Sequence, residues 1–172
     1  MIRIVIAEDQ EMLLAAMGSL LNLEEDMEVV GQARNGEEAL TLVHQLQPDV
    51  CLMDIEMPKM SGLDAAEAMK SLGCKVIILT TFARNGYQAR ALTADVRGYL
   101  LKDSPSEELA CSIRCIMNGK RVYSLELVDP DSRLDVNSRL EDSPFSKPSS
   151  DKIGQVRKYF SSIFDKMKQP TG

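Results

Sequence analysis

The chain has 172 residues, of which 44% are hydrophobic and 27% are charged, and its formal net charge is −6. This size suits one globular domain with an appendage, and no apolar run reaches the roughly 18 residues of a membrane-spanning helix. The start, MIRIVIAEDQ, has charges within its first apolar run and no small-residue cleavage site, so a secretory signal is not predicted. The four cysteines show neither metal-ligand spacing nor a disulfide scaffold, so we expect a cytoplasmic protein with reduced, buried cysteines.

Acidic residues are concentrated in the first part of the chain. Residues 1–124 contain 12 basic and 18 acidic side chains, whereas residues 125–172 contain eight of each. Within the second part, residues 147–168 contain six basic and two acidic side chains. Since proteins bind nucleic acid largely through basic groups on its phosphates, only the end of the chain is expected to do so.

Short apolar runs alternate with amphipathic segments through the first 121 residues. The expected strands cover 3–7, 27–33, 49–54, 75–81 and 97–101, and the expected helices cover 10–22, 36–46, 62–72, 84–93 and 104–117. Five such repeats predict an α/β fold, a (βα)5 doubly wound parallel sheet with helices on both faces. Either common doubly wound order fits the pattern, and the flavodoxin-like order 2-1-3-4-5 would place the ends of strands one and three side by side.

Several helix ends have recognisable signals. Asn35 can cap the second helix, and Gly73 can end the third. The run Ser104-Pro105-Ser106-Glu107 predicts an N-cap serine, a proline at the first helical position and a capping box in the fifth helix.

Polar side chains stand where the expected strands end. Glu8 and Asp9 follow the first strand, Asp54 ends the third, Thr80 ends the fourth and Lys102 follows the fifth. Three carboxylates so close repel one another unless a cation lies among them, and Mg²⁺ suits such oxygen ligands. With a hydroxyl and an ammonium beside them, these groups predict a site for a doubly charged tetrahedral anion next to a metal. The reaction that suits this site is attack by the Asp54 carboxylate on a phosphoryl group, with Mg²⁺ and Lys102 neutralising charge on its oxygens.

Short motifs contain these residues. They are Glu8-Asp9, Asp54 followed by MPKMSG, Thr80-Thr81, and Gly98-Tyr99-Leu100-Leu101-Lys102. Together, over about residues 1–121, they resemble the receiver domain of bacterial two-component response regulators. The segments LTTFAR and LLKDSPSEEL are most similar to receivers of the LuxR/NarL-type branch, which are joined to helix-turn-helix DNA-binding domains.

The resemblance implies roles for individual residues. Asp54 would be the phosphoacceptor, and Thr80 and Lys102 would sense the phosphoryl group. The Mg²⁺ site would consist of Glu8, Asp9, Asp54 and the backbone carbonyl of Glu56, and Tyr99 would be the switch aromatic. A sensor histidine kinase would donate the phosphoryl group, and activation would produce a homodimer. Asp95 stands where this branch usually has glycine, and aspartate tolerates the left-handed conformation better than most residues.

The end of the chain differs in composition from the rest. Residues 126–150 contain three prolines and six serines, so we read 122–150 as a linker. Residues 151–169 fit an amphipathic basic helix, and the run GQVRKYFSSIFDKM resembles a helix-turn-helix recognition helix in which Arg157 and Lys158 could contact DNA. The supporting helices have no counterpart in 124–150, so the output region is expected to be incomplete. Docking on the receiver, self-association, a membrane-surface helix and disorder are the alternatives for this segment.

Three classes of function fit these features. The first is a phosphorylation-switched response regulator, by descent a regulator of transcription and not a turnover enzyme. The second is a Mg²⁺-dependent aspartyl-phosphate phosphatase, but such enzymes need an Asp where this chain has Glu56, and their nucleophile follows the first strand. The third is a receiver-like interaction module without phosphorylation, against which the presence of Thr80 and Lys102 argues. As alternatives to signalling roles, Thr80 and Tyr99 could be strand filling, and Lys102 a surface lysine.

Overall fold

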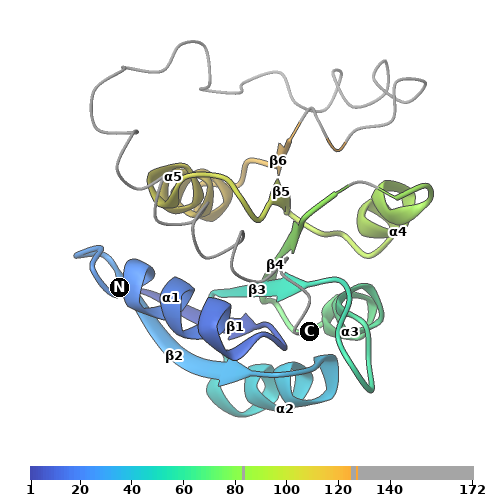
Figure 1. The fold of residues 1–172 in the computed structure, drawn as a ribbon, viewed down its shortest axis with the longest axis horizontal. Helices are drawn as coiled ribbons and strands as arrows, with labels where there is room; N and C mark the ends of the chain where they lie inside the picture. The colour runs from blue at the N-terminus through green and yellow to red at the C-terminus, as the bar shows by residue number, and fades with distance from the viewer. Residues whose placement is uncertain (83, 125–126, 128–172) are drawn as a thin grey trace, which may run out of the picture.

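The computed structural model describes residues 1–82, 84–124 and 127. A parallel sheet lies between two layers of helices (Figure 1), and its strand order is β2-β1-β3-β4-β5-β6. The strands are β1 (Ile2–Ala7), β2 (Met27–Ala33), β3 (Val50–Asp54), β4 (Lys75–Thr80), β5 (Gly98–Leu101) and β6 (Val122–Tyr123). The helices are α1 (Glu11–Leu21), α2 (Gly36–Leu46), α3 (Gly62–Met69), α4 (Tyr87–Thr93) and α5 (Ser106–Met117). The predicted α/β fold with order 2-1-3-4-5 is confirmed, and one further strand extends it.

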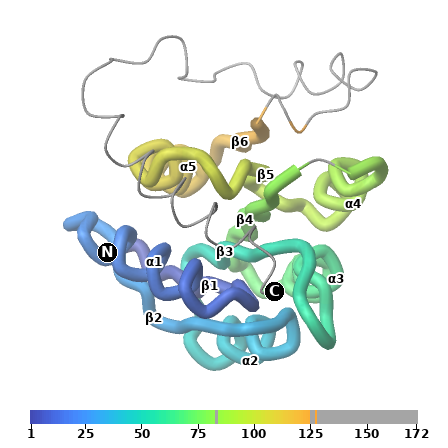
Figure 2. Tube along the Cα trace, in the orientation of Figure 1, coloured from blue at the N-terminus to red at the C-terminus, as the bar shows by residue number. Residues whose placement is uncertain are grey.

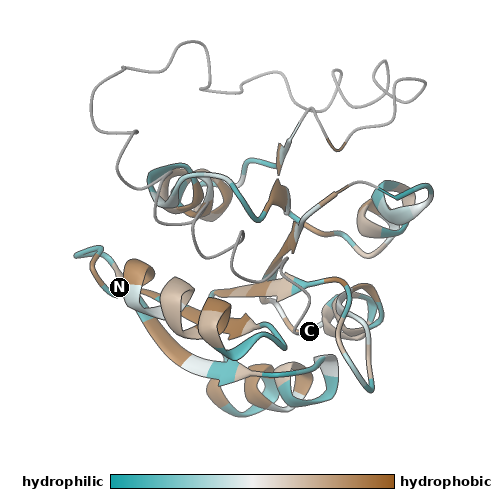
Figure 3. Ribbon diagram, viewed as in Figure 1, coloured by the Kyte–Doolittle hydropathy of each residue, from teal (hydrophilic) through white to brown (hydrophobic). Residues whose placement is uncertain are grey.

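The central strands β3 and β4 are mostly apolar (Figure 3), as expected for strands that helices cover on both faces. Side chains of one face, such as Ile4, Leu52 and Ile77, form a core cluster with residues of α1 and α5. Those of the other face, such as Val5 and Ile78, form a second cluster with residues of α2, α3 and α4. The tube in Figure 2 follows the chain as it passes through β2 from the layer of α1 to that of α2, and through β5 from the layer of α4 to that of α5.

Most predicted element bounds lie within two residues of the observed ones, and the caps explain the exceptions. Asn35 caps α2 as predicted, because its side chain accepts a hydrogen bond from the Glu38 N–H at 2.9 Å. The third helix ends at Met69, before the turn that Gly73 closes with a φ of 75°. The fourth helix begins only after Gly86, whose φ is 85°. Asp95 has a φ of 59°, which is the left-handed conformation expected for it.

The predicted capping box of the fifth helix is wrong. The N-cap of α5 is Pro105, with a ψ of 147°, and no side chain caps this end. The helix therefore begins at Ser106, and Glu107 is one position too early for the box. The Pro105 carbonyl instead accepts hydrogen bonds from the Glu108 and Leu109 N–H groups at 3.0 and 3.1 Å.

The sheet continues past residue 121, at which the sequence predicts the end of the domain. In β6, Val122 and Tyr123 pair with Gly98 and Tyr99 of β5. The predicted helix 151–169, with Arg157 and Lys158, and most of the predicted linker 122–150 lie outside the described residues.

All four cysteines are free thiols. Cys51 is buried, whereas Cys74, Cys111 and Cys115 are half-buried. Among the residues that the structure describes, no helix has the length and apolar character needed to cross a membrane.

Candidate functional site

The predicted carboxylates meet at one edge of the sheet. Strands β1 and β3 are neighbours, with Ala7 opposite Met53, so Glu8 and Asp54 emerge side by side. Carboxylate oxygens of Glu8, Asp9 and Asp54 all lie within 4.8 Å of one another. Glu8 and Asp54 are buried, with 1% and 8% exposed, and Asp9 is exposed. The strand topology therefore brings together three groups that the sequence pattern selected.

Lys102 reaches into this cluster from the end of β5. Its Nζ lies 2.6 Å from Glu8 Oε2 and 2.8 Å from Asp54 Oδ2. The Lys102 N–H donates to the Thr80 carbonyl at 2.8 Å, which fixes where the side chain leaves the sheet. One buried ammonium thus bridges two buried carboxylates, so Lys102 is not a surface lysine.

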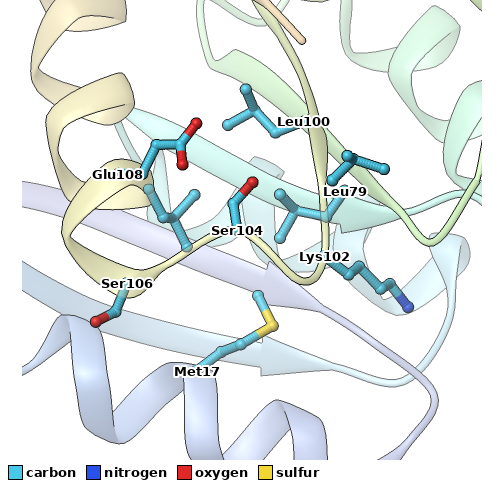
Figure 4. A pocket seen from close by; sticks show the side chains of 9 residues that line it. Met17, Leu79, Leu100, Lys102, Ser104, Ser106 and Glu108 are labelled. Carbon is cyan, nitrogen blue, oxygen red and sulfur yellow. The ribbon is translucent and has the colours of Figure 1, made fainter. Parts of the chain in front are cut away.

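A small hollow lies beside the cluster, between α1 and the start of α5. Its lining includes Met17, Leu79, Leu100 and Ser104. Figure 4 shows that the Lys102 side chain borders this hollow and points its ammonium away from Ser104. The hollow is therefore separate from the carboxylates.

Burial sets the protonation behaviour of the cluster. It raises the pKa of Glu8 from 4.5 to about 7, although the Lys102 ammonium opposes this rise. Burial also raises the pKa of Asp54, again against Lys102. Burial alone would lower the pKa of Lys102, but the two carboxylates outweigh it and raise that pKa. With Asp9, the site has three carboxylates and one ammonium, so it could hold a divalent cation that prefers oxygen ligands.

Backbone groups hold the two buried carboxylates in place. The Ile55 N–H donates to Asp54 Oδ1 at 2.7 Å, and the Gln10 N–H donates to Glu8 Oε1 at 3.1 Å. Gly62 lies against the Asp54 carbonyl so closely that a Cβ on Gly62 would overlap its oxygen. The loop after β3 can fold over the site only because residue 62 has no side chain.

Two other predicted residues lie at the rim. Thr80 is buried, and its hydroxyl donates to the Phe82 carbonyl at 3.1 Å. The Glu56 carboxylate points toward the β4–α4 segment, where it pairs with Arg84 at 2.8 Å and accepts from the Tyr87 hydroxyl at 3.4 Å. The role of the Glu56 carbonyl as a metal ligand stays a prediction.

The Tyr99 side chain is fully buried, and not half-buried as an ordinary strand tyrosine would be. It is 0% exposed and packs against Tyr123 of β6. We did not predict a contribution from Tyr123, because β6 has only two residues and thus no readable alternation. The nearest signal in the sequence is the pair Val122-Tyr123 between polar residues.

Comparison with known proteins agrees with this geometry. Residues 4–114 match the family model described as "Response regulator receiver domain". The chain is 53% identical over 180 aligned residues to the transcriptional regulatory protein DesR of Bacillus subtilis, covering 97% of this chain and 90% of that protein. It is 63% identical over 129 residues to YvfU of the same organism, covering 74% of this chain and 64% of the relative. The chain thus spans less than two thirds of YvfU.

A solved structure has the same fold. It is the crystal structure of a DNA-binding response regulator of the LuxR family from Staphylococcus aureus, with a TM-score of 0.66 and 42% identity. The match covers 69% of this chain and the whole of that one.

Proposed function

This chain belongs to the response regulator receiver family, and from that premise we propose that Asp54 accepts a phosphoryl group from a sensor histidine kinase while Mg²⁺ is bound. The observation that supports this most directly is the ammonium of Lys102 between Glu8 and Asp54. The cluster of hard oxygen donors fits Mg²⁺, with Glu8, Asp9 and Asp54 as ligands and the Glu56 carbonyl as a fourth. When bound, Mg²⁺ supplies positive charge for the phosphoryl oxygens.

The residues around Asp54 suit an in-line transfer. One carboxylate oxygen of Asp54 attacks the phosphorus, and the bond from phosphorus to the donor breaks, its electron pair leaving with the donor. The Ile55 N–H fixes the other oxygen of this carboxylate. Lys102, already 2.8 Å from Asp54 Oδ2, then neutralises a phosphoryl oxygen.

The phosphoryl group changes the balance of hydrogen bonds at the rim. It adds roughly −1.5 to −2 charges and strong acceptors. The Thr80 hydroxyl, bonded to the Phe82 carbonyl before transfer, turns to donate to the phosphoryl group. This movement changes the space beside the buried Tyr99 ring, so that a local change in charge alters the surface of α4, β5 and α5.

We further propose that this change leads to a homodimer and serves control of transcription, since DesR is named a transcriptional regulatory protein. DNA contact would come from Arg157 and Lys158. The chain acts as a phosphoacceptor and not as a phosphatase on an external substrate. The support for this is Glu56, which stands in the place of the second Asp of such phosphatases but is occupied in its pair with Arg84.

Intact mass measurement tests the central step. The full chain is incubated with a small-molecule phosphodonor such as phosphoramidate and with Mg²⁺. We expect the wild type to gain one phosphoryl group, and Asp54→Asn to gain none. Asp64→Asn is the matched control, because Asp64 is an exposed carboxylate that contacts Ser61 and Arg90, and it should be phosphorylated like the wild type. A phosphoryl group on Asp54→Asn, or none on the wild type, would refute the proposal.

The affinity for Mg²⁺ should depend on pH. Because burial raises the pKa of Glu8 from 4.5 to about 7, Glu8 binds a proton below that pH, and the cation must displace this proton. As the pH rises toward about 7, we expect the dissociation constant for Mg²⁺ to fall about tenfold per pH unit. Above about pH 7 it should level off. Calorimetric titration with Mg²⁺ measures it. Glu8→Gln should bind more weakly and lose much of this slope, and an unchanged slope would assign the proton to another group.

A further inference from the structure

We propose that Tyr123 is a positioning residue of the phosphorylation switch, and that β6 thereby couples the state of Asp54 to Ser124 and Leu127, which follow this strand. The inference rests on the proposed function, since it takes Asp54 as the phosphoacceptor and Tyr99 as the residue that responds to it. What it adds is a partner for Tyr99 that lies outside the five-stranded pattern.

The rings of Tyr99 and Tyr123 pack against each other inside the domain. Their centroids lie 5.8 Å apart with planes at 61°, which is an edge-to-face arrangement. Tyr99 is 0%, Tyr123 6% and Leu127 2% exposed, and all three belong to the same core cluster. Aromatic pairs in this geometry attract each other beyond the effect of burial. Tyr123 and Leu127 therefore supply one wall of the site that holds the Tyr99 ring.

Hydrogen bonds fix this wall to β5. The Ser124 N–H donates to the Tyr99 carbonyl at 2.8 Å, and the Tyr123 hydroxyl donates to the Val96 carbonyl at 2.8 Å. Burial raises the pKa of Tyr123 to about 12, so its hydroxyl keeps the proton that it donates at neutral pH. Tyr123 thus contacts the Tyr99 ring while its own ring is anchored at both ends, by its backbone neighbours and by its hydroxyl.

Tyr99 belongs to β5, and both β5 and its neighbour β4 end at the Asp54 site. Tyr99 stands opposite Ile78 of β4, two residues before Thr80, and is itself three residues before Lys102. Thr80 and Lys102, which would bind the phosphoryl group, thus stand at the ends of the strand beside Tyr99 and of the strand that contains it. A shift of Thr80 toward a phosphoryl group changes the space beside Tyr99, while Tyr123 determines how firmly the ring is held from the other side.

Coupling of this kind is reciprocal. If both the phosphoryl group and Tyr123 favour the buried position of Tyr99, each strengthens the other by the same factor. A phosphoryl group should therefore tighten the hold of β5 on Val122, Tyr123 and Ser124. Since the phosphoryl group already lies at Asp54 in the transition state of transfer, loss of the Tyr123 ring should also slow phosphorylation of Asp54. An aromatic contact of this type changes an equilibrium by about two- to tenfold.

Phosphorylation rates of the full chain, measured with phosphoramidate and Mg²⁺ by intact mass, test the first consequence. We expect Tyr123→Leu to lower the rate constant about two- to tenfold, and Tyr123→Phe, which keeps the ring pair, to stay within about twofold of the wild type. The matched control is Val122→Ala, because Val122 lies on the same strand but packs against the core cluster of the other face. It should lower thermal stability and leave the rate unchanged.

Hydrogen exchange tests the second consequence. With beryllofluoride and Mg²⁺ as the phosphoryl mimic, the Ser124 amide, which bonds to the Tyr99 carbonyl, should exchange more slowly in the wild type and not in Tyr123→Leu. If Tyr123→Leu is phosphorylated at the rate of the wild type, or if Val122→Ala loses as much of the phosphorylation rate as Tyr123→Leu, then Tyr123 only stabilises the fold. A wild type that gains no phosphoryl group would refute the proposed function, and the coupling with it.

Discussion

Replacement of Lys102 by methionine is expected to lower the free energy of unfolding by about 3–5 kcal/mol at about pH 8. The substitution keeps the length of the side chain but leaves Glu8 and Asp54 buried without the ammonium that lies 2.6 and 2.8 Å from them. Two like charges in a buried site are costly unless they are neutralised. Urea unfolding in the absence of metal measures the loss.

Two conditions should restore much of this loss. Acidification helps because the pKa values of Glu8 and Asp54, already raised by burial, rise further without Lys102, so that both carboxylates are neutral at higher pH than before. Divalent cations help because they replace the missing positive charge. Lys70→Met is the matched control, since Lys70 is exposed and its ammonium donates to a backbone carbonyl, that of Thr93, and not to a buried carboxylate. If both variants lose the same stability, the buried charge bridge does not stabilise the domain.

The same variant should be a poor phosphoacceptor. The Lys102 ammonium contacts Asp54 and can neutralise a phosphoryl oxygen, and loss of one such stabilising group typically costs about 10²- to 10³-fold in rate. Small-molecule phosphodonors measure this effect without a kinase. Because acid or divalent cations can restore stability without restoring the rate, the two roles of Lys102 can be separated.

The site was predictable because its residues follow strand ends. In a parallel sheet, all carboxyl ends lie at one edge, so the positions of Glu8, Asp54 and Lys102 in the sequence fix the edge at which they meet. The direct bridge from Lys102 to Glu8 was not predictable, since it depends on the length of one side chain reaching across the ends of β3 and β4.

The elements that we missed depend on tertiary contacts. Strand β6 has two residues, too few for a periodic pattern, and it forms because β5 offers an open edge and Tyr99 a ring to pack against. The start of α5 was misplaced because Ser104 and Glu107 have the spacing of a capping box, whereas the backbone at Pro105 stays extended.

Replacement of Gly62 by alanine is expected to cost about 3 kcal/mol of stability and most of the metal affinity and phosphoryl transfer. Its Cβ would overlap the carbonyl oxygen of Asp54, and backbone atoms cannot move aside as a flexible side chain can. The loop after β3 would have to shift, and with it the Ile55 N–H that holds Asp54 Oδ1. Gly73→Ala is the control: its φ of 75° costs about 1 kcal/mol, but no atom lies within 4 Å of the new Cβ, so the site should be unaffected. Chemical unfolding and titration with Mg²⁺ distinguish the two, and a Gly62→Ala protein with wild-type affinity would mean that the loop can yield without moving Asp54.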